Sequence, residues 1–73
     1  MASRSKGAAL WAAELKTRGE TQRQAAVALD VHETHASKVL AGGRLPGRRM
    51  AWDIYQRYGV PIESWDEPEE SAA

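Results

Sequence analysis

The chain of 73 residues contains no cysteine and no phenylalanine. Without thiols it can form neither a disulfide nor a thiolate metal site, and cysteine usage gives no indication of secretion. No run of β-branched residues occurs, so we predict no β-strand. Hydrophobic residues make up 42% of the chain, but thirteen of them are alanine. The few larger apolar side chains can form only a thin core, so we expect one small domain that a partner or self-association would stabilise.

Long apolar runs are also missing. The stretch that follows the basic start of the chain is rich in alanine and is interrupted by Glu14 and Lys16. It is too short for a signal peptide or a membrane span. We therefore expect a soluble, cytoplasmic protein.

The two parts of the chain carry opposite charge, although the formal net charge is zero. Residues 1–49 hold nine Lys/Arg against four Asp/Glu, a net charge of +5, and residues 50–73 hold one against six, a net charge of −5. A basic body indicates a polyanionic partner, and an acidic end indicates solvation or a regulatory contact. The alternative is that surface charges simply fall unevenly in a short chain.

The spacing of apolar residues predicts the first helix. Ala8, Trp11, Ala12 and Leu15 recur at intervals of three and four and form one face of a helix over about residues 6–18. Gly19 follows and ends it, since glycine adopts the left-handed cap conformation without strain.

Two short helices are expected next. Thr21 and Gln24 match a capping box, so the second helix starts at Gln22. Asp30 closes it, and a third helix runs from His32 or Glu33 over residues 33–41 to a pair of glycines. The inner faces of the two helices are small enough for a close, steep crossing. These inward residues are Ala25, Ala26, Leu29, Ala36, Val39 and Leu40.

A fourth helix is expected over residues 48–58, with Met50, Ala51, Ile54 and Tyr58 inward. Leu45 is the only apolar anchor of the turn before it. Pro61 then starts a short turn over residues 62–65. We predict residues 1–6 to be a flexible basic terminus, residues 7–65 to be the folded domain and residues 66–73 to be an acidic disordered tail.

Residues 8–65 resemble the Xre/Cro-type helix-turn-helix phage repressor family. The resemblance rests on the order and spacing of Leu15-Lys16, Gly19 to Gln22, Ala26, Leu29, Val31, Ala36, Val39, Gly42, Pro46, Ile54, Gly59-Val60 and Trp65. It implies an all-α, lambda-repressor-like bundle of four to five short helices. It also implies a DNA-binding transcriptional regulator, repressor-like, that reads an operator in the major groove with helix 33–41.

Two positions depart from the family pattern. Asp30 stands where the family usually has glycine in the turn, but aspartate tolerates left-handed backbone better than most residues. His32 stands where Ser or Thr commonly caps the recognition helix, so we expect a weaker cap there.

The resemblance places an outward set of base-contacting residues on the recognition helix: His32, Glu33, Thr34, Ser37 and Lys38. Lys38 suits guanine O6/N7, Glu33 suits cytosine N4 and Thr34 suits a thymine methyl. Glu33 could instead complement the helix N-terminus, and Lys38 could be an ordinary solvated lysine.

Phosphate contacts are expected from Gln22, Arg23, His35, Arg44, Arg48 and Arg49. The first two lie at a helix N-terminus, where free N–H groups favour anions. Arg48 and Arg49 begin the fourth helix, where cations oppose the helix dipole, so another use for them is indicated. A plain cluster of surface arginines is the alternative.

The pattern His32-Glu33-Thr34-His35 does not match a zinc-protease motif, because the histidines are three apart rather than four and no third ligand is near. We expect no metal, no cofactor and no catalytic site. Trp52 either closes the core or anchors a homodimer interface together with Tyr55, Ile62 and Trp65. The rival function is a protein-interaction module on the same fold, an antitoxin or anti-repressor whose acidic C-terminal region binds a protein partner.

Overall fold

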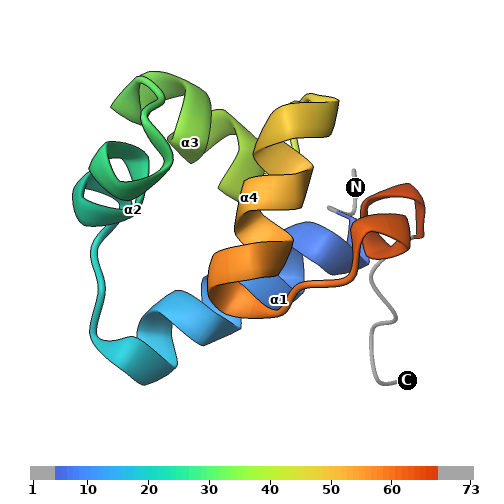
Figure 1. The fold of residues 1–73 in the computed structure, drawn as a ribbon, viewed down its shortest axis with the longest axis horizontal. Helices are drawn as coiled ribbons and strands as arrows, with labels where there is room; N and C mark the ends of the chain where they lie inside the picture. The colour runs from blue at the N-terminus through green and yellow to red at the C-terminus, as the bar shows by residue number, and fades with distance from the viewer. Residues whose placement is uncertain (1–4, 68–73) are drawn as a thin grey trace.

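Residues 5–67 form a bundle of short helices, and they are the residues that the computed structural model describes (Figure 1). The regular elements are α1 (Lys6–Arg18), α2 (Gln22–Leu29), α3 (Glu33–Leu40), α4 (Arg48–Tyr58) and the 3₁₀-helix η1 (Ile62–Asp66). All regular structure in this range is helical, which confirms the expected all-α class. None of these helices is both long and apolar enough to cross a bilayer. The expectations for residues 1–4 and 68–73 lie outside the described residues.

The start of each of the first two helices is fixed by a side chain. Ser5 Oγ accepts a hydrogen bond from the Ala8 N–H at 3.2 Å. Thr21 and Gln24 form the expected capping box: Thr21 Oγ1 accepts from the Gln24 N–H at 3.1 Å, and the Gln24 side chain accepts from the Thr21 N–H at 2.8 Å. Each bond satisfies a backbone donor that the helix itself leaves free.

Asp30 turns the chain between α2 and α3. Its backbone is left-handed, with φ 56° and ψ 45°, and its N–H bonds the carbonyl oxygens of Ala26 and Val27. It has the only positive φ among the non-glycine residues that the structure describes. The departure from glycine is therefore accommodated, at the modest strain that aspartate accepts in this region.

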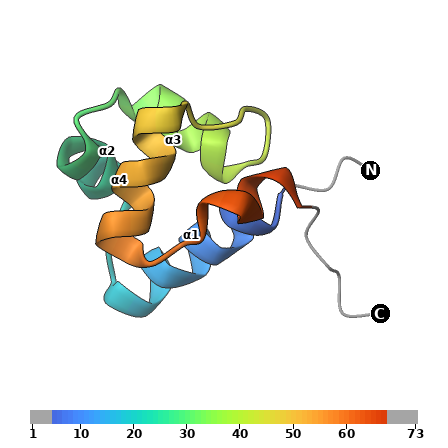
Figure 2. The same cartoon turned by 45° about the vertical axis from the view of Figure 1, so that its right-hand side comes forward.

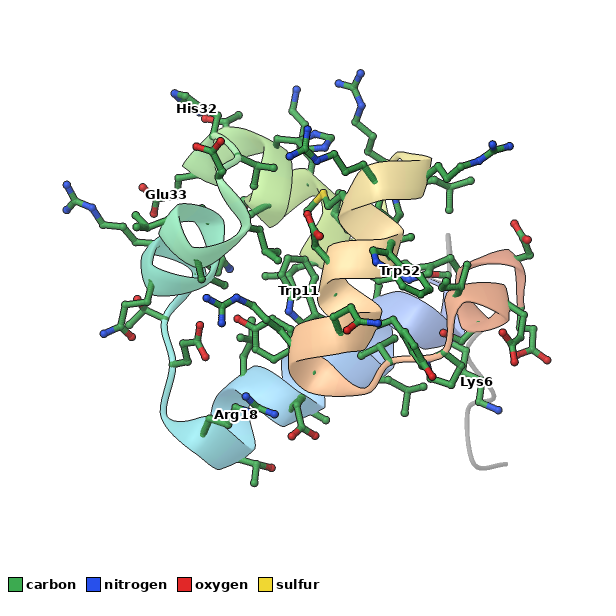
Figure 3. All side chains as sticks on the ribbon, in the orientation of Figure 1. Lys6, Trp11, Arg18, His32, Glu33 and Trp52 are labelled. Carbon is green, nitrogen blue, oxygen red and sulfur yellow. The ribbon has the colours of Figure 1, made fainter. Side chains whose placement is uncertain are left out.

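Trp11 is fully buried and lies in the middle of the bundle (Figure 3). Its ring centroid lies 6.1 Å from that of Tyr58 on α4 and 6.3 Å from that of Trp65 on η1. Tilted and edge-on contacts at this spacing are favourable between aromatic rings. The indole of α1 thus joins the fourth helix and the last turn of the chain.

The crossing of α2 and α3 depends on small side chains. Ala25, Ala26 and Ala36 are buried, together with Leu29 and Val39. Since alanine side chains add little bulk, the two helix backbones can approach closely, as the sequence predicted. Met50, Ala51, Ile54 and Tyr58 of α4 are also buried, as expected.

The last turn of the chain closes the bundle against the start of α1 (Figure 2). Trp65 is only 5% exposed, and a Cβ built on Gly7 would lie 2.5 Å from Trp65 Cδ2. The Lys6 N–H donates to the carbonyl oxygen of Glu67 at 2.7 Å. The folded region therefore extends beyond the expected range of residues 7–65, because Lys6 and Asp66 belong to helices.

Two local expectations need correction. Leu45 is 59% exposed, so it does not anchor the turn after α3 in the core. Backbone hydrogen bonds hold this turn instead, such as the one from the Gly43 N–H to the Lys38 carbonyl oxygen at 2.9 Å. The third helix ends at Leu40 rather than Ala41, which is its C-cap.

Gly7→Ala tests the closure of the bundle. Alanine normally favours a helix over glycine by up to about 1 kcal/mol. Here we expect a net loss of about 1–2 kcal/mol, because the methyl group must displace the Trp65 ring. Chemical denaturation followed by tryptophan fluorescence measures this change.

The matched control is Gly43→Ala. Gly43 has an ordinary backbone and only a 3.7 Å contact for an added Cβ, so we expect little change in the free energy of unfolding. Equal stability of the two variants would contradict the tight contact at Gly7.

Candidate nucleic-acid interface

The third helix presents one face to the core and the other to the surface. Ala36, Val39 and Leu40 are buried. Thr34 and Lys38, on the opposite side of the helix, are exposed. The structure therefore gives α3 an outward face that includes Thr34 and Lys38.

Ser37 lies at one flank of this face and is half-buried. It lines a hollow of about 420 Å³ together with Lys16, Glu20 and Gln22. This hollow lies between α1, the start of α2 and α3. One expected base contact, Ser37, and one expected phosphate contact, Gln22, are thus brought to the same place.

His35 lies at the other flank and is also half-buried. It lines a separate hollow of about 520 Å³ with Asp30 of the turn and with Arg49, Asp53 and Arg57 of α4. His35 therefore faces α4 rather than the outermost surface of α3. It lies with Arg49, the other expected phosphate contact on this side.

At the N-terminus of α2, two backbone N–H groups are not bonded by the capping residue Thr21. Thr21 takes the N–H of Gln24 through its side chain and the N–H of Ala25 through its carbonyl. The N–H groups of Gln22 and Arg23 are not used by the cap, and both side chains are exposed. These groups can bind an anion at the positive end of the helix dipole.

Arg44, Arg48 and Arg49 are exposed at and after the turn that follows α3. Gly47 caps α4 without a side-chain bond, and the first turn of α4 contains no acid. Among residues 5–67, Arg18 and Glu14 form an ion pair with an N···O distance of 3.2 Å. None of the three arginines forms an ion pair with another residue in this range. Within the described part of the chain these charges have no acidic partner, and they oppose the dipole of α4.

Glu33 and His32 lie at the N-terminus of α3, on the outer edge of the molecule (Figure 3). Glu33 is the one acid in the first turn of the helix. It can therefore both complement the helix dipole and reach a partner, so the two alternatives for Glu33 do not exclude each other.

His32 is the N-cap of α3. Its Nδ1 accepts a hydrogen bond from the Thr34 N–H at 3.1 Å. The expected weak cap is thus supplied by an imidazole nitrogen. Sequence reasoning missed this role, because histidine is not among the usual capping residues and its ring can turn either nitrogen toward the helix.

A polar contact holds the linker before α2. The Tyr58 hydroxyl donates to the Glu20 carboxylate at 2.6 Å, and the Arg18 guanidinium lies 4.9 Å from the centre of the Tyr58 ring. Burial raises the pKa of Tyr58 to about 12, with further contributions from the hydrogen bond and from the charge of Glu20. Arg57 and Arg18 oppose this shift. No local pattern in the sequence pairs these residues, since 38 positions separate Tyr58 from Glu20.

The expected interface residues divide into two groups. Trp52, Tyr55 and Ile62 are exposed, and the Trp52 and Tyr55 rings lie 5.7 Å apart on the outer side of α4. Trp52 is 52% exposed and does not close the core. Trp65 does not belong to the expected interface, because its side chain is buried against Gly7 and Trp11.

In the part of the chain from residue 5 to residue 67, no group of three His, Cys, Asp or Glu side chains is placed to hold a metal ion. The chain matches no protein-family model, no curated protein and no solved structure at a significant level of similarity.

Tyr58→Phe tests the contact with Glu20. The raised pKa of Tyr58 means that the unfolded chain loses this proton from about pH 10, whereas the folded chain keeps it to about pH 12. The contribution to stability is therefore fully present below pH 10 and lost as the pH rises to 12. We expect the free energy of unfolding to fall by on the order of 2 kcal/mol over this interval.

The Tyr58→Phe variant keeps the ring but has no hydroxyl to titrate. Its free energy of unfolding should therefore fall less between pH 10 and pH 12, which chemical denaturation at a series of pH values would measure. Tyr55→Phe, at an exposed site, serves as the control and keeps the decline. A decline of the same size in Tyr58→Phe and in the unaltered chain would contradict the contact.

Proposed function

We propose that this protein is a sequence-specific DNA-binding transcriptional regulator, repressor-like, that places α3 in the major groove. The observation that carries the proposal is the outward face of α3, which is flanked by exposed cations and backbone donors on both sides. The start of α2 supplies them at one flank, and the start of α4 supplies them at the other. This is the arrangement that a protein needs to hold a reading helix between two phosphate backbones.

The width of an α-helix permits this use. A helix with its side chains is about 10–12 Å in diameter, and the major groove is about 12 Å wide. Thr34 and Lys38 are exposed one helical turn apart on α3, where they could read a thymine methyl and guanine O6/N7. Glu33 suits cytosine N4, and Ser37 suits either a donor or an acceptor at the edge of a base.

The distribution of charge supports the same orientation. Residues 22–49 carry five Lys/Arg against Asp30 and Glu33, a net charge of +3. Residues 50–67 carry Arg57 against four acids, a net charge of −3. A polyanion is therefore attracted to α2, α3 and the start of α4, and repelled from the last turn of the chain.

A single domain of this size reads few base pairs, so two copies on two half-sites about 34 Å apart belong to the proposal. Among the exposed apolar residues, Trp52, Tyr55 and Ile62 are those that we assign to such a contact. Resemblance to the Xre/Cro-type family, made from the sequence, also supports a regulator of this kind.

The second candidate is a protein-interaction module, and the exposed pair Trp52 and Tyr55 is the observation that favours it. Exposed aromatic residues commonly anchor protein interfaces. A partner would bind this outer side of α4, since Trp65 is not accessible.

Lys38→Ala and Arg48→Ala should have different effects on DNA binding. Selection of bound sequences from a random pool first identifies the preferred site. Lys38→Ala should relax preference at one position, with a loss of about 1–3 kcal/mol on the preferred site. Arg48→Ala should weaken binding on every sequence and reduce the salt dependence by about one phosphate contact.

Lys6→Ala is the matched control, because Lys6 lies at the far end of the molecule from His32 and Glu33 (Figure 3). It removes one positive charge and should leave both specificity and salt dependence nearly unchanged. Absence of binding at low salt, or equal binding to all sequences, would refute the proposed function.

Trp52→Ser separates the two candidate functions. If the outer side of α4 joins two copies on DNA, the variant should remain folded but bind half-sites singly, which sedimentation and mobility shift would detect. Loss of a protein partner with unchanged DNA binding would favour the interaction module. Removal of residues 60–67 is unsuitable for this purpose, since Trp65 is part of the core.

A further inference from the structure

His32 bonds the α3 backbone in a way that only one protonation state permits. Its Nδ1 lies 3.1 Å from the Thr34 nitrogen and accepts the N–H at the second position of the helix. An imidazole nitrogen can accept only when it carries no proton. The capped state is therefore the neutral ring with its proton on Nε2.

We propose that His32 is a positioning residue for DNA binding: its neutral imidazole holds the first turn of α3, and protonation releases that turn. The inference rests on the proposed function, because it concerns the presentation of Glu33 and Thr34 to bases. In the neutral state Nε2–H remains as a single outward donor, suited to an acceptor such as guanine N7 or O6.

Protonation changes two things at the same site. The imidazolium has no free lone pair, so the bond to the Thr34 N–H is lost. It also places a positive charge at the positive end of the α3 dipole, which opposes the helix. Both effects weaken the first turn of an eight-residue helix, which has little other means of holding its end.

Within residues 5–67, His32 Nδ1 is the side-chain acceptor to which the Thr34 N–H donates. Asp30 and Glu33 flank it on its own segment, and α2 contributes Arg23 as its only charged residue. His35, Arg49, Asp53 and Arg57 line the hollow beside the turn. From α1, Lys16 faces the other end of α3 with Glu20 of the following linker.

The sign of the pH effect distinguishes this role from simple electrostatics. Protonation of a histidine on a DNA-binding surface adds positive charge and would ordinarily strengthen binding. Release of the α3 cap predicts the opposite. DNA affinity should fall on acidification from pH 7.5 to pH 5.5, where histidine gains its proton.

The experiment measures DNA affinity of the full chain at these two pH values for three variants. The unaltered chain should lose about five- to tenfold at pH 5.5. His32→Asn keeps a good capping side chain at both pH values, so its affinity at pH 5.5 should equal its affinity at pH 7.5, whether or not the loss of the imidazole N–H lowers both. His32→Ala removes the cap and should bind weakly at both.

His35→Asn is the matched control, since it removes the neighbouring histidine but leaves the cap intact, and the acid loss should persist. The inference is overturned if the affinity of the unaltered chain rises on acidification, or if His32→Asn keeps the loss.

A second readout needs no DNA. The Thr34 amide resonance should titrate together with the His32 ring in the unaltered chain and should not titrate in His32→Asn. A Thr34 amide resonance that does not change with the protonation of the His32 ring would overturn the cap role. If the unaltered chain binds no DNA at any pH, the proposed function fails alone, and the Thr34 amide still decides the cap.

Discussion

The packing of Trp11 against Tyr58 and Trp65 is the contact on which the rest of the structure depends. A chain with few large apolar side chains must bury those it has around one centre, and Trp11 is the largest side chain that is fully buried. Its two aromatic neighbours come from α4 and η1, so these two elements close against α1. Gly7 permits this closure, because Trp65 occupies the space that any side chain would need.

This closure leaves α2 and α3 at one end of the bundle, away from the aromatic centre (Figure 1). Their own crossing is made by alanines, which bury little area and contribute correspondingly little free energy. The hydrogen bonds at their ends therefore carry more weight than in a helix pair with large side chains. The capping box of Thr21, the left-handed Asp30 and the imidazole of His32 together fix where each helix starts and stops.

The candidate interface combines groups that are far apart in the sequence. Gln22 and Ser37 line one hollow, and His35 and Arg49 line another. The uncompensated arginines at the start of α4 cost some helix stability, which is reasonable where they serve a partner. Residues 50–67 carry a net negative charge, although Asp53 lines the hollow beside His35 and Arg49. The outward face of α3, with exposed arginines after it, is thus the surface for which we propose a polyanionic partner.

The sequence by itself determined the helices and most of their boundaries. Apolar spacing, the Thr21–Gln24 pair and glycines such as Gly19 act within a few residues, so local rules suffice for them. Only the tertiary structure decided the burial of Trp65, the exposure of Trp52 and Leu45 and the bond from Tyr58 to Glu20. These depend on which helices pack together, and residues far apart in the chain leave no local pattern. The tertiary structure also shows which nitrogen of His32 caps α3. The sequence leaves both ring nitrogens possible, and in the structure Nδ1 accepts the hydrogen bond.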